Sequence, residues 1–335
     1  MDISIIIPTY NRHKNILQLI ESINNNQTLL SKFLYEIIVV SNLKDPVLNK
    51  KIKKKYSHLY IKLISCDEKG ANKARNLGGE IATGDILLFI DDDCRIDDPK
   101  IFNKFIKTHK ENTGVAVVGG RYQLIEKANV LQRAYQEIYN CWSNSGKNDQ
   151  VCLPKIVGGC LSIKKRFFNN LSKFSEQIIY GSSETEFISR LCKSGHSVLL
   201  DENIIITHNP NVTFSTFIQK AFLQALNSRD EYLTGENIDY NISDSYLGFF
   251  FKNIYKFSFS VGLFYRKINV NEYDIQMFKI FKVIIDCYVI DPLVIYIISL
   301  NQTLPYRAIQ KVYYFIKYQI KYNILFRTIE KIKNG

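Results

Sequence analysis

Three consecutive aspartates, Asp91, Asp92 and Asp93, directly follow an apolar run at residues 86–90. Like charges at the end of a buried strand repel one another, and proteins commonly neutralise such a group with a cation. Carboxylate oxygens suit Mg²⁺ or Mn²⁺, and either ion can bridge to the phosphate oxygens of a nucleotide. The structural alternative is a solvated acidic turn. We favour a metal site because the aspartates come immediately after an apolar strand.

Apolar runs alternate with segments of helical periodicity ahead of and behind the aspartates. The predicted strands cover residues 2–7, 35–40, 59–64, 86–90 and 115–119, and the predicted helices cover residues 14–24, 46–56, 71–82 and 99–112. This alternation predicts an α/β fold with a mainly parallel, Rossmann-like sheet flanked by helices, which binds ligands beyond the carboxyl ends of its strands. Tyr10, Asn11, Ser41 and Asn42 follow two of those ends, so we expect them to meet the aspartates in one crevice.

The length of 335 residues fits one domain of roughly 200 residues followed by a smaller region. We predict a catalytic domain over residues 1–210 and a helical region over residues 211–335. The net charge of +12 permits nucleic acid, anionic lipid or a phosphorylated small molecule as partner. The seven cysteines are scattered and form no CxxC pair, which is typical of reduced thiols. Because no secretory signal is evident either, we expect a cytoplasmic protein.

The predicted helical region contains two stretches that bear on membrane contact. Residues 283–300 are apolar, but Asp286, Asp291 and Pro292 interrupt them, so a buried or interfacial helix pair is favoured over a membrane span. Residues 302–335 interleave seven basic residues with aromatic ones and carry a single acid, Glu330. Two interpretations stay open for this end: peripheral attachment to the inner face of the cell membrane, or packing of its aromatic residues on the catalytic domain.

Four segments in chain order resemble family-2 glycosyltransferases of the GT-A fold. They are SIIIPTYNR at residues 4–12, NKARNLG at residues 72–78, GDILLFIDDD at residues 84–93, and ETEF at residues 184–187 with Arg190. Each segment is a weak signal alone, and the four in order at compatible spacing are a strong one. The resemblance covers roughly residues 1–210. It implies transfer of a sugar, with inversion, from a nucleotide diphosphate sugar to a hydroxyl group of a glycan or lipid-linked glycan.

The resemblance also assigns expected roles to residues of this chain. The first loop, with Pro8, Thr9, Tyr10 and Asn11, would contact the nucleotide. Arg75 is expected near the diphosphate. Asp91 or Asp92 is expected to face the ribose. Asp93 is expected to bind Mn²⁺ or Mg²⁺, and Asp91 and His208 are further candidates for that metal site. For His208, a hydrogen-bonded histidine at a strand end is an equally good interpretation.

This chain departs from the family pattern at two places. The second strand of family members usually ends in an acidic pair that binds the base, whereas Ser41 and Asn42 stand here. Asn42 can still form hydrogen bonds, and UDP remains the expected nucleotide. Glu184 stands where the family places its base aspartate. We predict Glu184 as the general base and Glu186 as the next candidate, with favourable charge at a helix start as the structural alternative.

Three other functions compete with this prediction. A nucleotidyltransferase would need a glycine-rich basic loop after the first strand, which residues 9–15 lack. An inactive nucleotide-sugar- or membrane-binding module is suggested by Ser41, Asn42 and Ser183. A nucleic-acid binder rests on net charge alone, and we predict no nucleic-acid partner. The Gly158–Gly159–Cys160 cluster resembles the family's glycine-rich strand beside the donor sugar, although close packing explains glycines equally well.

Overall fold

The structure is a computed structural model that describes residues 2–26, 35–144, 155–170, 173–178, 183–213, 216–217 and 219–221. The apolar stretch at 283–300 and the basic end at 302–335 lie outside these residues, so the predicted boundary near residue 210 stays a prediction. In the described part, no helix has both the length and the apolar character to cross a membrane.

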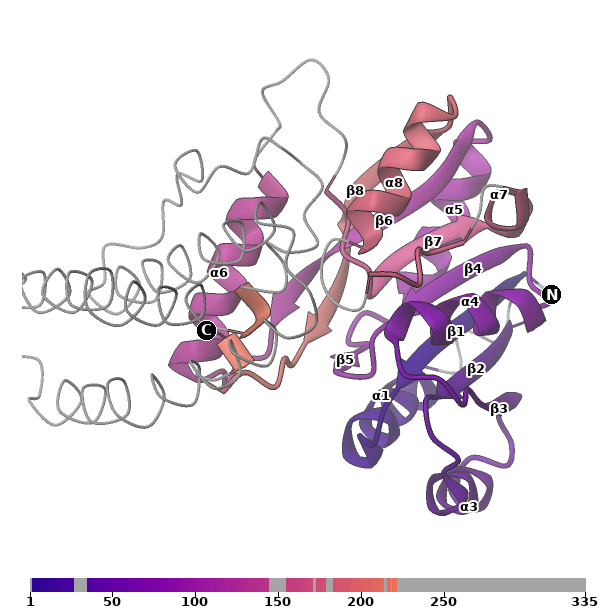
Figure 1. Cartoon of the computed structure of the whole chain (residues 1–335), viewed down its shortest axis with the longest axis vertical. Helices are drawn as coiled ribbons and strands as arrows, with labels where there is room; N and C mark the ends of the chain where they lie inside the picture. The colour runs from indigo at the N-terminus through magenta and orange to yellow at the C-terminus, as the bar shows by residue number, and fades with distance from the viewer. Residues whose placement is uncertain are drawn as a thin grey trace, which may run out of the picture.

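The described strands form one eight-stranded mixed sheet with the order β3-β2-β1-β4-β7-β6-β8-β5 (Figure 1). The first four strands pair in parallel, as predicted, and β7 enters antiparallel between β4 and β6. The predicted α/β fold is therefore confirmed. The strands are β1 (Ile3–Thr9), β2 (Tyr35–Ser41), β3 (Ile61–Ser65), β4 (Ile86–Ile90), β5 (Cys94–Arg95), β6 (Val115–Leu124), β7 (Cys160–Lys164) and β8 (Ser197–His208).

Helices cover both faces of this sheet, which explains why its central strands are apolar at consecutive positions. On β1, Ile5 and Ile7 pack with α1, α3 and α5, whereas Ile6 packs with α4, α7 and α8. The helices are α1 (His13–Asn25), α3 (Pro46–Lys55), α4 (Ala71–Ile81), α5 (Ile101–Glu111), α6 (Val130–Asn144), α7 (Lys165–Asn170) and α8 (Ser183–Lys193).

The polar and aromatic residues at 128–155 are more typical of a surface lid or loop, yet most of them form the helix α6. A capping box explains its start: the Gln132 backbone N–H donates to Asn129 Oδ1, and the Asn129 N–H donates to Gln132 Oε1, each at 2.9 Å. Ala134 and Tyr135 are then buried on the inner side of the helix. The aromatic residues are therefore partly a packing surface, and Tyr135 and Tyr139 reach the cleft described below.

A buried carboxylate, Glu36 on β2, ties neighbouring segments together. It accepts hydrogen bonds from Ser4 Oγ at 2.6 Å and from the Thr83 N–H and Oγ1 at 2.6 and 2.7 Å. It also pairs with Lys62 Nζ at 2.7 Å. Burial acts to raise the pKa of Glu36, but these donors outweigh burial and lower the pKa to about 2.

Glu36→Gln should lower the free energy of unfolding at pH 7 by about 2–3 kcal/mol, because it breaks a buried ion pair. A carboxylate with a lowered pKa stabilises the fold above its unfolded pKa, and that stability is lost as the pH falls toward the folded value of about 2. The difference in free energy of unfolding between wild type and Glu36→Gln, measured with urea, should therefore become smaller as the pH falls from about 5 to 2. Glu111→Gln, an exposed control on α5, should change stability by under about 0.5 kcal/mol. Equal stability of wild type and Glu36→Gln at pH 7 would contradict this role.

Candidate active site

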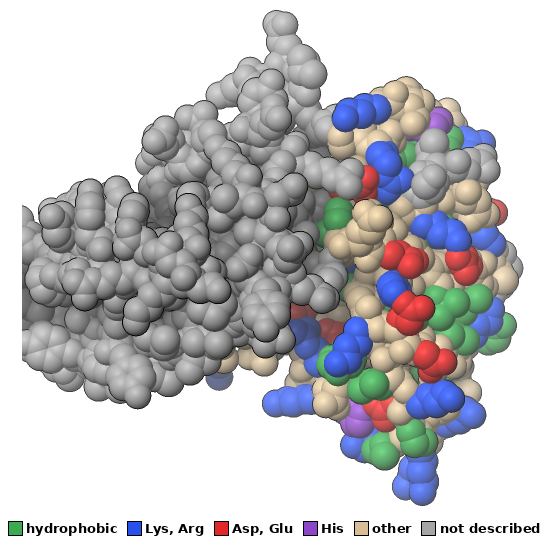
Figure 2. Space-filling model, in the orientation of Figure 1, with side chains coloured by type: hydrophobic (Ala, Val, Ile, Leu, Met, Phe, Trp, Pro, Cys, Tyr) green, Lys and Arg blue, Asp and Glu red, His purple; other side chains and the backbone are tan. Residues whose placement is uncertain are grey.

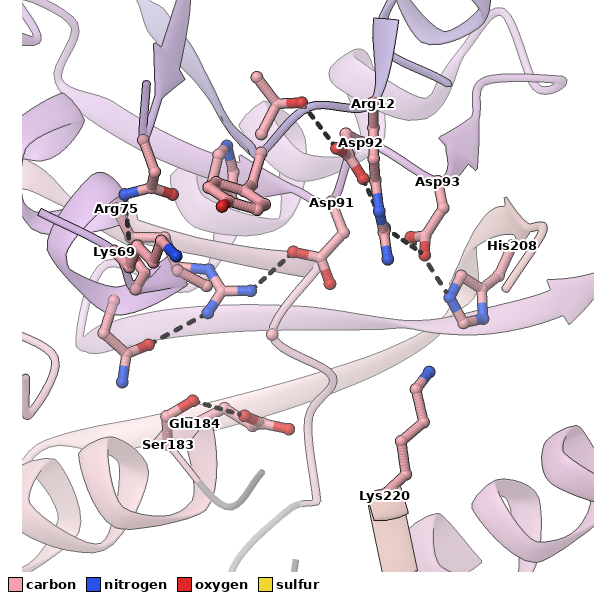
Figure 3. Close-up of a pocket in the computed structure, with 18 of the residues that line it drawn as sticks. Arg12, Lys69, Arg75, Asp91, Asp92, Asp93, Ser183, Glu184, His208 and Lys220 are labelled. Atoms are coloured by element: carbon pink, nitrogen blue, oxygen red, sulfur yellow. Dashed lines mark hydrogen bonds and ion pairs between the residues drawn. The ribbon is translucent and has the colours of Figure 1, made fainter. Parts of the chain in front are cut away.

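A cleft of about 440 Å³ opens at the carboxyl ends of β1, β2 and β4 (Figure 3). The sequence predicted a crevice at this edge, and the three aspartates all reach it. The residues that line it are Pro8, Thr9, Tyr10, Arg12, Asn42, Lys69, Gly70, Ala71, Asn72, Arg75, Asp91, Asp92, Asp93, Tyr122, Tyr135, Tyr139, Gly158, Ser183, Glu184, His208 and Lys220. Asn11 and Glu186 are predicted site residues that do not line the cleft.

Asp92 holds the loop that follows β1. Thr9 Oγ1 donates to Asp92 Oδ2 at 2.7 Å, and Arg12 Nη1 lies 2.9 Å from Asp92 Oδ1. Burial raises the pKa of Asp92 to about 6, against the opposing charge of Arg12. Asn11, between these two contacts, has a φ of 50°, a left-handed conformation that asparagine tolerates well. Asp92 therefore fixes the shape of the first loop.

Asp91 turns the other way and is held by two buried groups. Arg75 Nη2 lies 2.6 Å from Asp91 Oδ1, and the Tyr122 hydroxyl donates to Asp91 Oδ2 at 3.3 Å. Burial raises the pKa of Tyr122 well above its usual value, so the phenol stays a hydrogen-bond donor. The ring of Tyr122 also stacks on His208 with centroids 4.2 Å apart. Tyr122 therefore links two predicted site residues, and no sequence pattern marked it.

The asparagines of the NKARN segment explain how α4 places its arginine. Asn72 Oδ1 accepts from Arg75 Nη1 at 3.1 Å, and Asn72 Nδ2 donates to the Ser175 and Ile178 carbonyls. Asn76 bonds both backbone groups of Phe174, each at 2.9 Å. One face of α4 thus orients Arg75 and anchors residues 174–178, the described segment ahead of α8.

Asp93 lies beside His208 because β5 pairs antiparallel with β8. In that pairing Cys94 lies opposite His208, and the Asn209 N–H donates to the Asp93 carbonyl at 2.8 Å. His208 Nε2 is then 3.5 Å from Asp93 Oδ1. Burial acts to raise the pKa of Asp93, but His208 and then Arg12 outweigh it and lower the pKa below its usual range.

This pair fits part of a metal coordination sphere. Two ligand atoms that each lie about 2.1 Å from one cation are about 3.0–3.5 Å apart, which matches the His208–Asp93 separation. The other ring nitrogen of His208, the buried Nδ1, has no hydrogen-bond partner among the described residues. Within the described residues, no group of three His, Cys, Asp or Glu side chains is arranged to hold a metal. A cation here would therefore need oxygen ligands from substrate or water.

Glu184 and Glu186 have different surroundings in the first turn of α8. Glu184 lines the cleft, where its closest hydrogen bond is from Ser183 Oγ at 3.2 Å. Burial and then the charge of Asp91 raise the pKa of Glu184, and Arg75 opposes them. Glu186 instead forms a two-point ion pair with Arg190, at 2.6 and 3.0 Å. Of the two predicted bases, Glu184 alone faces the cleft.

Two consecutive glycines give the functional side chains their space. An added Cβ on Gly159 would lie 2.2 Å from the Tyr122 hydroxyl and 2.6 Å from Asp91 Cγ. At Gly158 it would lie 3.4 Å from Glu184 Oε2, in ordinary contact. Close packing is therefore the reason for Gly159, while Gly158 has room for a methyl group beside the carboxylate.

Alanine substitutions at these two positions should separate packing from access to the cleft. Gly159→Ala should lower stability by about 1–3 kcal/mol, because Tyr122 or Asp91 must move. Gly158→Ala, the matched control, should melt within about 2 °C of wild type but weaken ligand binding, because the methyl group enters the cleft beside Glu184. Differential scanning calorimetry checks stability, and titration calorimetry with a nucleotide checks binding. Equal melting temperatures of the two variants would contradict the steric clash that we expect for a side chain at Gly159.

The residues expected to contact a nucleotide occupy one end of the cleft. Tyr10 is 43% exposed, and Lys69 Nζ lies 5.5 Å from the centre of its ring. Asn42 donates its amide protons to the Glu68 and Gly70 carbonyls, at 2.7 and 3.2 Å. Asn42 therefore braces the loop that carries Lys69 and keeps an acceptor oxygen, Oδ1. Tyr10 is placed to stack on a flat ligand at the entrance.

Sequence reasoning missed several residues that line the cleft. Tyr122 and Tyr139 come from β6 and α6, and Lys69 and Lys220 bring positive charge from two further segments. Lys220 Nζ lies 4.5 Å from the centre of the Tyr135 ring, and its charge contributes to lowering the pKa of Asp93. The aromatic residues at 128–144 were a usable signal, because tyrosines at helical spacing can line one side of a pocket.

Comparison with known proteins agrees with this geometry. The family described as glycosyl transferase family 2 matches residues 4–171, half of the chain. This chain belongs to that family. The match spans three of the four segments that carried the resemblance, and the fourth, at residues 184–187, lies just beyond it. Family membership thus rests on β1, α4 and β4, the elements that place Thr9, Arg75 and the aspartates.

Two curated relatives and one solved structure illustrate the range of family 2. Glycosyltransferase AglE of Haloferax volcanii is 26% identical over 66% of this chain and 70% of its own length. The dolichol-phosphate mannosyltransferase of Pyrococcus furiosus is 32% identical over 36% of this chain and 34% of its own length. The mannosyltransferase PcManGT of Pyrobaculum calidifontis, solved with GDP-Man and Mn²⁺, is 15% identical with a TM-score of 0.52, covering 96% of this chain and 87% of that one. This structural likeness supports the GT-A fold.

Proposed function

We propose that this chain transfers a hexosyl group, with inversion, from a nucleotide diphosphate sugar to a hydroxyl group of a glycan or lipid-linked glycan. The observation that carries the proposal is the position of Glu184 in the same cleft as Asp91, Asp92 and Asp93, with Gly158 beside it (Figure 3). This transfer requires a carboxylate that accepts the acceptor proton and, in the same cleft, a site that stabilises the negative charge of the leaving diphosphate.

Glu184 would act as the general base. The acceptor oxygen attacks the anomeric carbon, its proton passes to the Glu184 carboxylate, and the bond to the nucleoside diphosphate breaks on the opposite side of the sugar. Burial and the nearby Asp91 charge raise the pKa of Glu184, which makes it a better proton acceptor than an exposed carboxylate. The positive charge of Arg75 opposes this rise in the pKa of Glu184.

Asp93 and His208 would hold Mn²⁺ or Mg²⁺, with the remaining ligands from substrate and water. Asp91, the further candidate, is held by Arg75 instead. The cation supplies charge stabilisation to the departing diphosphate. Tyr10 would stack on the base, and Thr9 and Asp92 keep the first loop in place for it. UDP is the nucleotide that we propose, with Asn42 Oδ1 as a hydrogen-bond acceptor for the base.

The names of the relatives bear on the rest of the proposal. A glycosyltransferase and a dolichol-phosphate mannosyltransferase among them support a lipid-linked or glycan acceptor, and the Mn²⁺ complex of PcManGT supports a divalent cation. We propose a cytoplasmic reaction in which the acceptor is presented at the inner face of the membrane, as part of envelope polysaccharide synthesis.

A screen of UDP- and GDP-sugars tests this function. The protein is incubated with each donor and with membrane-extracted lipid-linked glycans, with and without Mn²⁺, and released nucleoside diphosphate is measured. Metal-dependent release that requires acceptor supports the proposal. Metal-linked nucleotide binding with no release from any donor would instead support a binding module of the same fold.

A further inference from the structure

Helix α3 presents a lysine-rich face to solvent on the side away from the core. Leu48 and Ile52 point inward and are buried. Five exposed lysines occupy the outer side and the turn before it: Lys44, Lys50, Lys51, Lys53 and Lys54. In the described part of the chain no carboxylate forms an ion pair with any of these five, whereas the neighbouring Lys55 pairs with Glu21 at 2.7 Å. The positive charge of this face is therefore uncompensated.

Apolar side chains are exposed on and beside the same helix. Val47 is 55% exposed and Leu43 is 42% exposed, although most large apolar residues of the described chain are buried. Val47 is three, four and seven positions from Lys50, Lys51 and Lys54, so the four residues share one side of the helix. Lysines that surround exposed apolar groups are typical of protein surfaces that meet lipid headgroups.

This face adjoins the entrance of the cleft. Thr9 and Ser41 are paired at the ends of β1 and β2, so Tyr10 and Leu43 follow neighbouring strand ends. Figure 1 places α3 at one end of the molecule, and Figure 2 shows lysine or arginine side chains gathered there together with hydrophobic ones. The lysine-rich face therefore begins at the edge of the cleft and extends away from it along α3.

We propose that α3 and the preceding Leu43 form a docking face for an anionic lipid surface, which brings the cleft entrance against the membrane. Charge alone would equally suit nucleic acid. The exposed Leu43 and Val47 favour lipid, because they can enter the headgroup region while the lysines remain at its charged surface. Docking here does not rest on the transfer reaction, and it uses residues outside the predicted helical region at 211–335.

Cosedimentation of the full-length chain with phosphatidylglycerol-containing vesicles tests the proposal. Lys50, Lys51 and Lys54→Gln together should weaken binding on the order of 100-fold, at about fivefold for each lysine near an anionic surface. A matched control removes the same charge elsewhere, by Lys107, Lys110 and Lys193→Gln on α5 and α8. The control should bind within about twofold of wild type. Melting temperature and nucleotide affinity of both variants should match wild type, since neither set lines the cleft.

Three outcomes decide the proposal. The proposal is supported if vesicle binding is lost in the α3 lysine variant but not in the control, and is also weakened by Leu43 and Val47→Ser. Equal binding by all variants would overturn it and assign any vesicle binding to other segments. Tight RNA binding that is lost in the lysine variant but unchanged by the serine substitutions, together with weak vesicle binding, would also overturn it in favour of nucleic acid.

Discussion

Glu184→Gln should lower glycosyl transfer by about 10²- to 10⁴-fold while nucleotide-sugar affinity stays within about threefold, because glutamine fills the same space but cannot accept the acceptor proton. Glu184 faces the cleft beside Gly158, and its carboxylate accepts hydrogen bonds from Ser183 Oγ and from its own backbone N–H. The measurement is kcat against KM for donor and acceptor. The matched control is Glu186→Gln on the same helix turn, which should lose stability through its Arg190 pair but keep most of its turnover.

The same substitution should raise stability at neutral pH. A carboxyl group whose folded pKa is raised stabilises the fold below its unfolded pKa, and this contribution is lost as the pH rises through the folded pKa. Wild type loses free energy of unfolding when the buried Glu184 ionises, whereas glutamine does not ionise. Glu184→Gln should therefore have a higher melting temperature than wild type at pH 7 and about the same melting temperature at pH 4. A variant that is inactive and also less stable at pH 7 would indicate a structural role. Activity retained in Glu184→Gln and lost in Glu186→Gln would make the base assignment wrong.

Asp93→Ala should abolish the Mn²⁺-dependent part of nucleotide binding. Ligand at 100 times its Kd stabilises a protein by about 2.7 kcal/mol, and this shift should disappear in the variant. Transfer should fall by about 10³-fold, since stabilisation of a leaving diphosphate by a cation is worth several kcal/mol. Thermal-shift titrations with nucleotide diphosphate, in Mn²⁺ and in EDTA, make the comparison.

Asp67→Ala is the control for this variant, because Asp67 is exposed and does not line the cleft. It should retain the full Mn²⁺ response. Asp93→Ala also removes one of two ion pairs of Arg12, which keeps its pair with Asp92, so nucleotide binding in EDTA must be compared between variant and wild type. An unchanged Mn²⁺ response in Asp93→Ala would remove Asp93 from the metal site and leave the His208 separation as a hydrogen-bond contact.

The predicted parallel strands and the crevice at their carboxyl ends followed from local pattern. Consecutive apolar residues at 5–7 and 86–90 leave neither face of the strand for water, so these strands had to lie between helices. The order of such strands then places Thr9 and the aspartates at one edge. The antiparallel entry of β7 was not predictable in this way, because a short apolar run carries no direction. Helix α6 was not predictable either, because its polar and aromatic composition is more typical of a surface loop.

The sequence by itself determined which residue types could do chemistry here: a row of aspartates after a buried strand, an arginine in α4, and acids at the start of α8. Only the tertiary structure shows that each of the three aspartates has a different partner. Asp91 pairs with Arg75, Asp92 with the first loop, and Asp93 with His208, which is more than a hundred residues away in sequence and arrives through the β5–β8 pairing. The physical reason is that apolar periodicity is a local property of the chain, whereas the contacts of a charged group depend on which distant segments pack beside it.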